Sequence, residues 1–209
     1  VVSTIHPNII KSFTTPYSDG ADFRTTEGTN IVTELIGEPL GLPAGALNRT
    51  KFSGETHVST SERNWPGHLA TLLAKQAPVN LELTVEKDVE NSKATATVKA
   101  VFTQTISDPV YLTVMVTESH ITNPQLTDQG KVPNYEHNFI LRKAVTPYFG
   151  TLLKDEILQA GRTFEKGFEI EIDDAWEYKN CSIVVVVNRH GETGDNSKEI
   201  LQVNSFDLK

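Results

Sequence analysis

In the region after Pro78, which is more than half of this 209-residue chain, short segments alternate apolar and polar residues with a period of two. The pattern begins at VNLELTVEK, where Val79, Leu81, Leu83 and Val85 share one face. Strict alternation is typical of a β-strand with one buried face. Further segments follow, separated by Asn, Asp, Gly and Pro: ATATVKAVF, VYLTVMVTE, HNFILRKA, GFEIEID, CSIVVVVN and EILQVNSF. This series predicts a two-sheet antiparallel sandwich of immunoglobulin-like type, and the run IVVVV predicts a central strand that is covered on both faces.

The residues before Pro78 have a different pattern, which predicts a mixed α/β layer. VVSTI is short and apolar on both faces, as a central parallel strand would be, and PAGALN is expected to form the next strand. One helix is expected from Thr25 or Thr26 to Gly37, and a second over 62–75 with Pro66 in its first turn. We therefore place a domain boundary at Ala77–Pro78, which separates residues 1–77 from residues 78–209.

Pro43 precedes the second expected strand, in the segment GLPAGALNR. An X–Pro bond loses only about 0.5–1 kcal/mol on becoming cis, so a turn can hold it in that form. The order strand, loop, helix, Gly, Pro, strand, helix matches a thioredoxin-like fold from its second strand onward. Residues 1–77 are thus expected to be a truncated thioredoxin-like domain, in which His6, Leu42 and Pro43 border a substrate groove. The alternative is that Pro43 simply starts a strand.

Composition argues against several classes of function. The formal net charge is −8 and no basic cluster is longer than LRK, so binding to nucleic acid or to anionic lipid by charge is not expected. The longest apolar run, SIVVVVN, is much shorter than a membrane span. Cys181 is the single cysteine and is expected to be a small buried hydrophobic residue. No Walker loop, dinucleotide fingerprint or nucleophile elbow occurs, so neither a cofactor nor a catalytic residue is expected.

Three segments carry a family resemblance: DFRTTEGTNIV, LPAGALNR and YEHNFILRKAVTPYFGTLL. They resemble the twenty-eight-kilodalton outer-membrane-protein family of Bacteroidetes-type bacteria, from His6 to about Val203. The resemblance implies an envelope lipoprotein or surface protein with a thioredoxin-like and an immunoglobulin-like domain, located at the outer membrane or cell surface. It also implies that a strand–helix unit, often with a Cys-x-x-Cys pair, precedes Val1. Membrane contact would occur only through a lipid anchor that this sequence lacks.

His137, Asn138 and Arg142 form the most notable group of polar residues. If they lie on one strand, His137, Phe139 and Leu141 share one face, while Asn138 and Arg142 project to the other. The family resemblance adds Glu118 and Gln125 from the preceding loop. Such a set could bind a ligand or a metal, or it could anchor a long loop. We favour the anchoring role and expect no metal, because buried polar groups need partners in any case.

The leading functional hypothesis is a binding or adhesin-like protein of the cell envelope that has no catalytic activity in this chain. Its ligand would be a protein or a glycan at the cell surface. The alternative is a thiol-disulfide oxidoreductase-like protein whose Cys-x-x-Cys pair lies upstream of this chain. A dimer through the exposed sheet edge at residues 1–5 is a further expectation, since an uncovered edge favours strand pairing.

Overall fold

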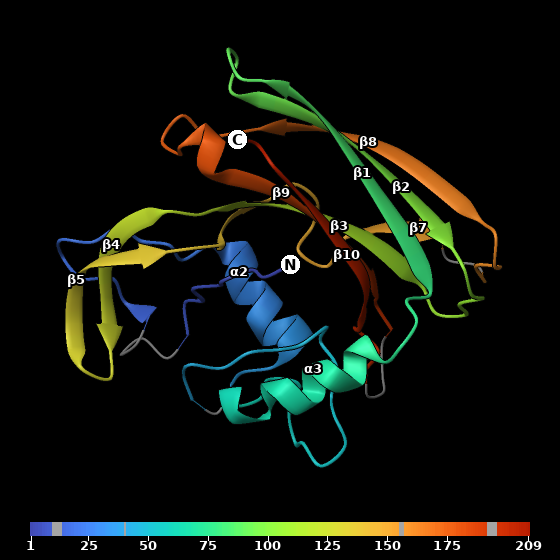
Figure 1. Ribbon diagram of the computed structural model, residues 1–209, viewed down its shortest axis with the longest axis horizontal. Helices are drawn as coiled ribbons and strands as arrows, with labels where there is room; N and C mark the ends of the chain where they lie inside the picture. The colour runs from blue at the N-terminus through green and yellow to red at the C-terminus, as the bar shows by residue number, and fades with distance from the viewer. Residues whose placement is uncertain (10–13, 40, 155–156, 192–195) are drawn as a thin grey trace.

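The computed structural model describes residues 1–9, 14–39, 41–154, 157–191 and 196–209 (Figure 1). Its helical elements are short: α2 (Thr26–Asn30) continues as the π-helix η1 (Ile31–Ile36), the 3-10 helix η2 (Glu62–Asn64) leads into α3 (Trp65–Leu73), and η3 (Tyr178–Asn180) precedes a late strand. The strands are β1 (Val79–Asp88), β2 (Lys93–Phe102), β3 (Val110–Glu118), β4 (Ile121–Thr127), β5 (Gly130–His137), β6 (Ile140–Ala144), β7 (Thr151–Lys154), β8 (Thr163–Glu171), β9 (Cys181–Arg189) and β10 (Ile200–Asp207).

The strands form two main sheets and a separate hairpin. The first sheet has the order β1-β2-β8. The second has the order β10-β9-β3-β6, and β7 also pairs with β3. Strands β4 and β5 pair only with each other, and every strand pair is antiparallel. The described residues thus confirm a mixed α+β chain that is dominated by antiparallel sheet.

The main hydrophobic core lies between the two sheets. Its buried residues come from alternate positions of each strand, as in β2, where Ala94, Ala96, Val98, Ala100 and Phe102 are buried. In β9 the corresponding residues are Ile183, Val185 and Val187. Alternate side chains of a strand point to opposite faces, so the alternation in the sequence specifies which face of each strand enters this core.

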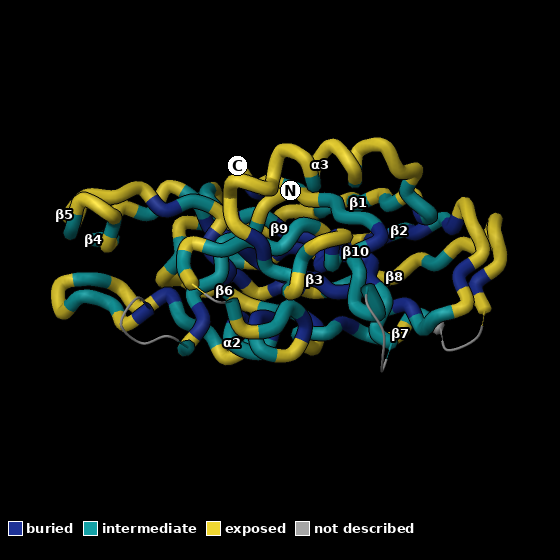
Figure 2. The backbone as a smooth tube through the Cα atoms, turned by 90° about the horizontal axis from the view of Figure 1, so that it is seen from below, coloured by how far each residue is buried: buried dark blue, intermediate teal, exposed yellow. Residues whose placement is uncertain are grey.

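A second core covers the outer face of the five-stranded sheet. Ile31 and Leu35 of η1 pack there against Met115, Val184 and Val186. Strand β9 is therefore buried on both faces, as the run IVVVV predicts (Figure 2). The helix that covers it begins and ends as predicted. Thr25 caps its start by accepting a hydrogen bond from Gly28 N at 2.9 Å, and Gly37 follows it with φ of 88°.

The strands expected before Pro78 do not form. VVSTI contributes only Thr4, which makes a parallel bridge to Ile140 of β6 with a Thr4 N···Phe139 O distance of 2.7 Å. PAGALN contributes only Gly45, which bridges to Thr60. Both segments are β-branched or small enough for strands, but each makes one isolated bridge that does not extend into a ladder. Residues 1–5 therefore lie along the edge of the β6 side of the sandwich instead of forming a parallel sheet.

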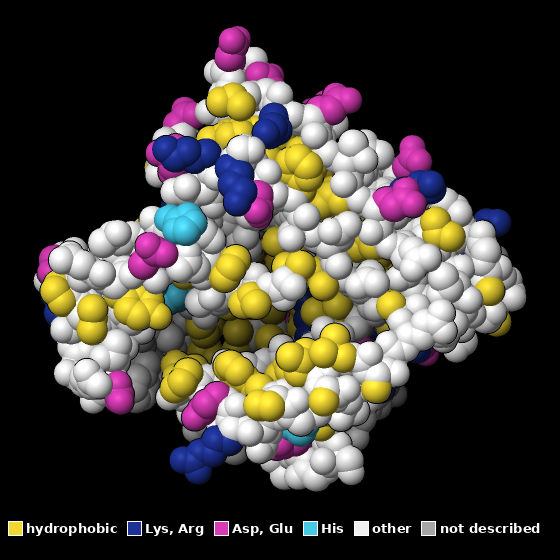
Figure 3. All heavy atoms as spheres, in the orientation of Figure 1, with side chains coloured by type: hydrophobic (Ala, Val, Ile, Leu, Met, Phe, Trp, Pro, Cys, Tyr) yellow, Lys and Arg dark blue, Asp and Glu magenta, His cyan; other side chains and the backbone are white. Residues whose placement is uncertain are grey.

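Helix α3 forms as predicted, but its apolar face is uncovered. None of its residues is buried, and Leu69 and Leu73 are 48% and 77% exposed (Figures 2 and 3). Trp65 is the best anchored: its ring lies against Gly45, where an added Cβ would be 2.5 Å from the Trp65 ring, and its Nε1 donates to Thr60 O. The helical spacing of the apolar residues thus predicts the helix without predicting a partner for it.

The predicted strand 137–144 is interrupted after His137. Phe139 has φ of 59°, and the backbone turns there between β5 and β6. As a result His137 is buried while Phe139 is 46% exposed, so the two side chains do not share a face as they would on one continuous strand. The Leu42–Pro43 peptide bond is cis.

Candidate functional site

A cleft opens where the N-terminal segment passes beside the β4–β5 hairpin. It encloses a cavity of about 120 Å³, which we call the histidine cleft. His6 and residues 14–17 and 21–24 line one side of it, and 123–126 with His137 line the other. The hairpin ends at His137, and the isolated bridge between His6 and Arg24 holds the two N-terminal segments of the wall together. The cleft is therefore built from segments that are distant in the sequence.

The floor of the cleft consists of three rings in mutual contact. The centroids of His6 and Phe23 are 5.5 Å apart, those of Phe23 and His137 are 5.0 Å apart, and those of His6 and His137 are 5.9 Å apart. Tyr135 extends the cluster, with its ring 4.9 Å from that of His137. These separations lie in the range that aromatic pairs prefer.

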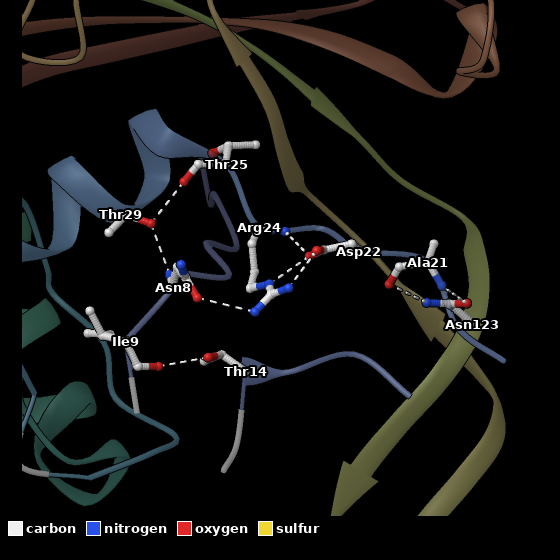
Figure 4. Close-up of polar contacts among 9 residues, drawn as sticks. All are labelled: Asn8, Ile9, Thr14, Ala21, Asp22, Arg24, Thr25, Thr29 and Asn123. Carbon is white, nitrogen blue, oxygen red and sulfur yellow. Dashed lines mark hydrogen bonds and ion pairs between the residues drawn. The ribbon is translucent and has the colours of Figure 1, made fainter. Parts of the chain in front are cut away.

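Polar contacts join the two walls (Figure 4). Asn123 Oδ1 accepts a hydrogen bond from Ala21 N at 3.0 Å, and its Nδ2 donates to Ala21 O at 3.3 Å. Arg24 pairs with Asp22, with Nη2 2.7 Å from Oδ2, and its Nη1 also donates to Asn8 Oδ1. Outside this view, Lys131 of β5 contacts Asp19 at 2.7 Å. The hairpin is thus held to the N-terminal segment by side chains of both.

Both imidazoles are biased toward the neutral form. Burial lowers the pKa of His6 most, the nearby His137 lowers it further, and Asp22 opposes the shift. Burial also lowers the pKa of His137, against the hydrogen bonds to backbone at Asn123 and Pro124. His137 Nε2 lies 3.2 Å from Asn123 O. A neutral imidazole has one donor and one acceptor. Because His137 Nε2 donates to Asn123 O, the His137 ring offers its remaining nitrogen to a ligand hydroxyl as an acceptor.

Glu118 and Arg142 lie behind the cleft floor. Arg142 Nε is 3.3 Å from Glu118 Oε2, and Glu118 Oε1 accepts a hydrogen bond from Glu177 N at 2.9 Å. The Arg142 guanidinium lies 5.8 Å from the ring of Phe23 and 5.1 Å from that of Trp176. Because Glu118 is buried, this pair fixes the loop before η3 and supports Phe23 from below.

The structure brings together only some of the residues singled out in the sequence. His6, Gln125 and His137 line the cleft, and Arg142 contacts its floor. Asn138 does not line it and bonds instead to His120 N and Glu136. Leu42 and Pro43 are also absent from its lining. Sequence reasoning missed Phe23, Arg24 and Asn123, because no local spacing links them to His137.

The described residues offer little for metal or thiol chemistry. Among them no three His, Cys, Asp or Glu side chains are grouped so as to hold a metal ion. Cys181 is buried at the start of β9, and burial, with Glu118 nearby, raises its pKa to about 12. A thiol of that kind is not a nucleophile near neutral pH. No described helix has the length and apolar character needed to span a membrane.

Comparisons with known structures give distant similarities. A domain of the outer membrane lipoprotein Omp28 from Porphyromonas gingivalis has 16% identity and a TM-score of 0.41, over 64% of this chain and 90% of that one. The ApaA protein from Bordetella pertussis has 15% identity and a TM-score of 0.26, over 64% and 98%. A GH3 β-glucosidase from Bifidobacterium adolescentis has 17% identity and a TM-score of 0.24, over 62% and 17%.

The sequence comparison is more informative. No protein of curated function matches the chain. The family model described as outer membrane protein Omp28 matches residues 38–209, which is most of the sequence and includes the whole sandwich. That description agrees with the location in the cell envelope that the resemblance implies. The chain therefore belongs to the Omp28 family of outer membrane proteins.

Proposed function

We propose that the chain is a non-catalytic, adhesin-like binding protein of the cell envelope and that the histidine cleft is part of its recognition surface. The observation that carries the proposal is the lining of the cleft, which combines the contacting rings of His6, Phe23 and His137 with the amide of Gln125. A concave site with an apolar floor and a few converging polar groups is typical of ligand binding.

A glycan fits this lining better than a protein does. Sugar hydroxyls both donate and accept hydrogen bonds, as neutral imidazole and amide groups do. The apolar face of a sugar ring can pack on aromatic side chains. Among the described residues the Gln125 amide donates to the neighbouring Leu126 O at 2.9 Å, and this exposed contact leaves it able to turn toward a ligand.

The proposal keeps the finer fold interpretation made from the sequence. We infer that residues 78–209 are immunoglobulin-like, which the two packed antiparallel sheets support. We infer that residues 1–77 derive from a thioredoxin-like layer, which the order of α2, Pro43 and α3 supports. The oxidoreductase-like alternative stays a prediction about sequence outside this chain, since Cys181 offers no accessible thiol here.

The experiment is to apply the purified chain to an array of neutral and acidic envelope glycans, beside a panel of host matrix proteins. Gln125→Ala changes the cleft lining, and Gln129→Ala makes the same replacement at the exposed tip of the same hairpin. We expect glycan binding that Gln125→Ala weakens severalfold and Gln129→Ala leaves unchanged. Equal loss in both variants, or no binding of any glycan, would refute the proposal.

A further inference from the structure

A second cavity, of about 270 Å³, lies on another part of the molecule. The end of η1, the segment around Arg49 and residues 196–198 line it. We call it the Arg49 cavity. None of its described lining residues belongs to the histidine cleft, so ligand binding at the Arg49 cavity would be independent of ligand binding at the histidine cleft.

Arg49 is the unusual feature of this cavity. The residue is only 5% exposed, and no described residue accepts a hydrogen bond from its Nη1. Buried guanidinium groups are normally paired, because taking an unpaired charge out of water is costly. Burial alone lowers the pKa of Arg49, to about 10, with no opposing contribution from a carboxylate. Among the described residues, the buried Arg49 Nη1 therefore lacks an acceptor.

The backbone around Arg49 is fixed on both sides. Asn48 and Arg49 have φ of 50° and 52°, in the left-handed region that non-glycine residues seldom adopt. Asn48 O accepts a hydrogen bond from Ile200 N at 2.7 Å, and Lys51 N donates to Asn196 Oδ1 at 2.8 Å. These contacts hold the guanidinium at the cavity even though no described group there neutralises it. Conformations of this kind persist where the surroundings impose them, and they are frequent at ligand sites.

Basic side chains gather at the cavity, although the chain as a whole is acidic. Lys51 and Lys198 line it together with Arg49, whereas Glu34 is the one carboxylate among its described lining residues. Glu34 is already engaged by the hydroxyl of Tyr148, and Lys198 Nζ donates to the backbone oxygen of Glu34. Burial lowers the pKa of the neighbouring His190 most, Lys198 and Arg49 lower it further, and Glu34 opposes the shift.

We propose that the Arg49 cavity binds the carboxylate of a small acidic molecule, either an acidic sugar or an acidic amino acid. The guanidinium fork matches the two oxygens of a carboxylate, and such charge-assisted bonds are short and strong. Thr33 and Ser197 add hydroxyls, and Leu35, Ile36 and Val58 give the cavity an apolar part that suits the carbon skeleton of the ligand.

The test is calorimetric titration of the purified chain, in a chloride buffer, with glucuronate, N-acetylglutamate and inorganic phosphate. We expect millimolar or tighter binding of one of the two carboxylates, which also identifies the source. Arg49→Met should weaken it at least tenfold, and Lys198→Gln severalfold. Lys99→Gln removes a charge from the exposed face of β2 and serves as the matched control, which should bind as the wild type does.

Each other outcome counts against the proposal. If neither carboxylate binds, or if Arg49→Met binds as tightly as the wild type, the cavity is not a carboxylate site. Binding of phosphate alone would overturn the assignment of the ligand class. Circular dichroism of each variant shows whether weaker ligand binding is caused by the substitution itself or by loss of the fold. The Gln125→Ala variant of the histidine cleft should titrate normally, which distinguishes failure here from failure of the proposed function.

Discussion

Replacing Arg49 by methionine should stabilise the protein in the absence of ligand. The substitution removes the charge and keeps an unbranched side chain of similar length. Methionine and arginine tolerate the backbone φ of 52° at this position equally well. Burial lowers the pKa of Arg49 from 12.5 to about 10, and at 1.36 kcal/mol per pKa unit this corresponds to about 3 kcal/mol of unfavourable burial. Imperfect packing of the new side chain offsets part of this gain. We expect the free energy of unfolding to rise by about 2 kcal/mol, or the melting temperature by roughly 4–8 °C for a chain of this size.

The assay is urea and thermal unfolding in an amine–chloride buffer without carboxylate or phosphate, because a bound anion would stabilise the wild type alone. Arg142→Met is the matched control, since it makes the same replacement at a guanidinium that is paired with the buried Glu118. The free energy of unfolding of Arg142→Met should fall by about 3 kcal/mol, because the substitution leaves the Glu118 carboxylate without its cationic partner. A fall in the stability of Arg49→Met would mean that its guanidinium has a native partner, and the reasoning would be wrong.

Three further predictions follow from the described contacts. Lowering the pH from 7 to 5.5 should lower the melting temperature. The native pKa values of His6 and His137 lie below the ordinary 6.5, so the unfolded chain takes up protons at a higher pH than the folded chain does. A melting temperature that stays constant or rises would contradict this prediction. Gly28→Ala should lower the free energy of unfolding by about 1–2 kcal/mol, because its Cβ would lie 2.8 Å from Thr25 Oγ1 and 2.9 Å from Ile5 Cγ2. Gly67→Ala in α3, where the added Cβ meets no atom, should be neutral or stabilising. Denaturant unfolding compares the two variants, and equal effects would refute the packing argument. Cys181 should react with a thiol reagent such as dithionitrobenzoate only after unfolding, and fast reaction of the native protein would show that it is accessible.

The sandwich could be predicted because each of its strands carries its own signal. In β1 and β2 the more buried side chains alternate along the strand, and in β9 they run continuously. The order of apolar and polar residues therefore predicts whether one face or both faces of a strand are buried. The helix from Thr26 to Ile36 is equally local, with its cap at Thr25 and its end at Gly37. Features that depend on a few neighbouring residues were therefore available from the sequence.

The β4–β5 hairpin could not be found in this way. Pro124 and Pro133 interrupt its strands, and most of its side chains are exposed or half-buried, so neither period two nor a continuous apolar run marks it. The candidate sites are still less local. The rings of Phe23 and His137 meet across most of the length of the chain, and Arg49 becomes unusual only when its lack of a described acceptor is known.

The placement of η1 on the outer face of the five-stranded sheet has a consequence for biogenesis. Ile31 and Leu35 are translated long before Val184 and Val186, with which they pack. During synthesis this apolar surface can contact Met115 and Leu141 first, but it lacks its partners in β9 until that strand has been made. Such long-range closure slows folding and prolongs exposure of adhesive surface, so the nascent chain should depend on a holding chaperone.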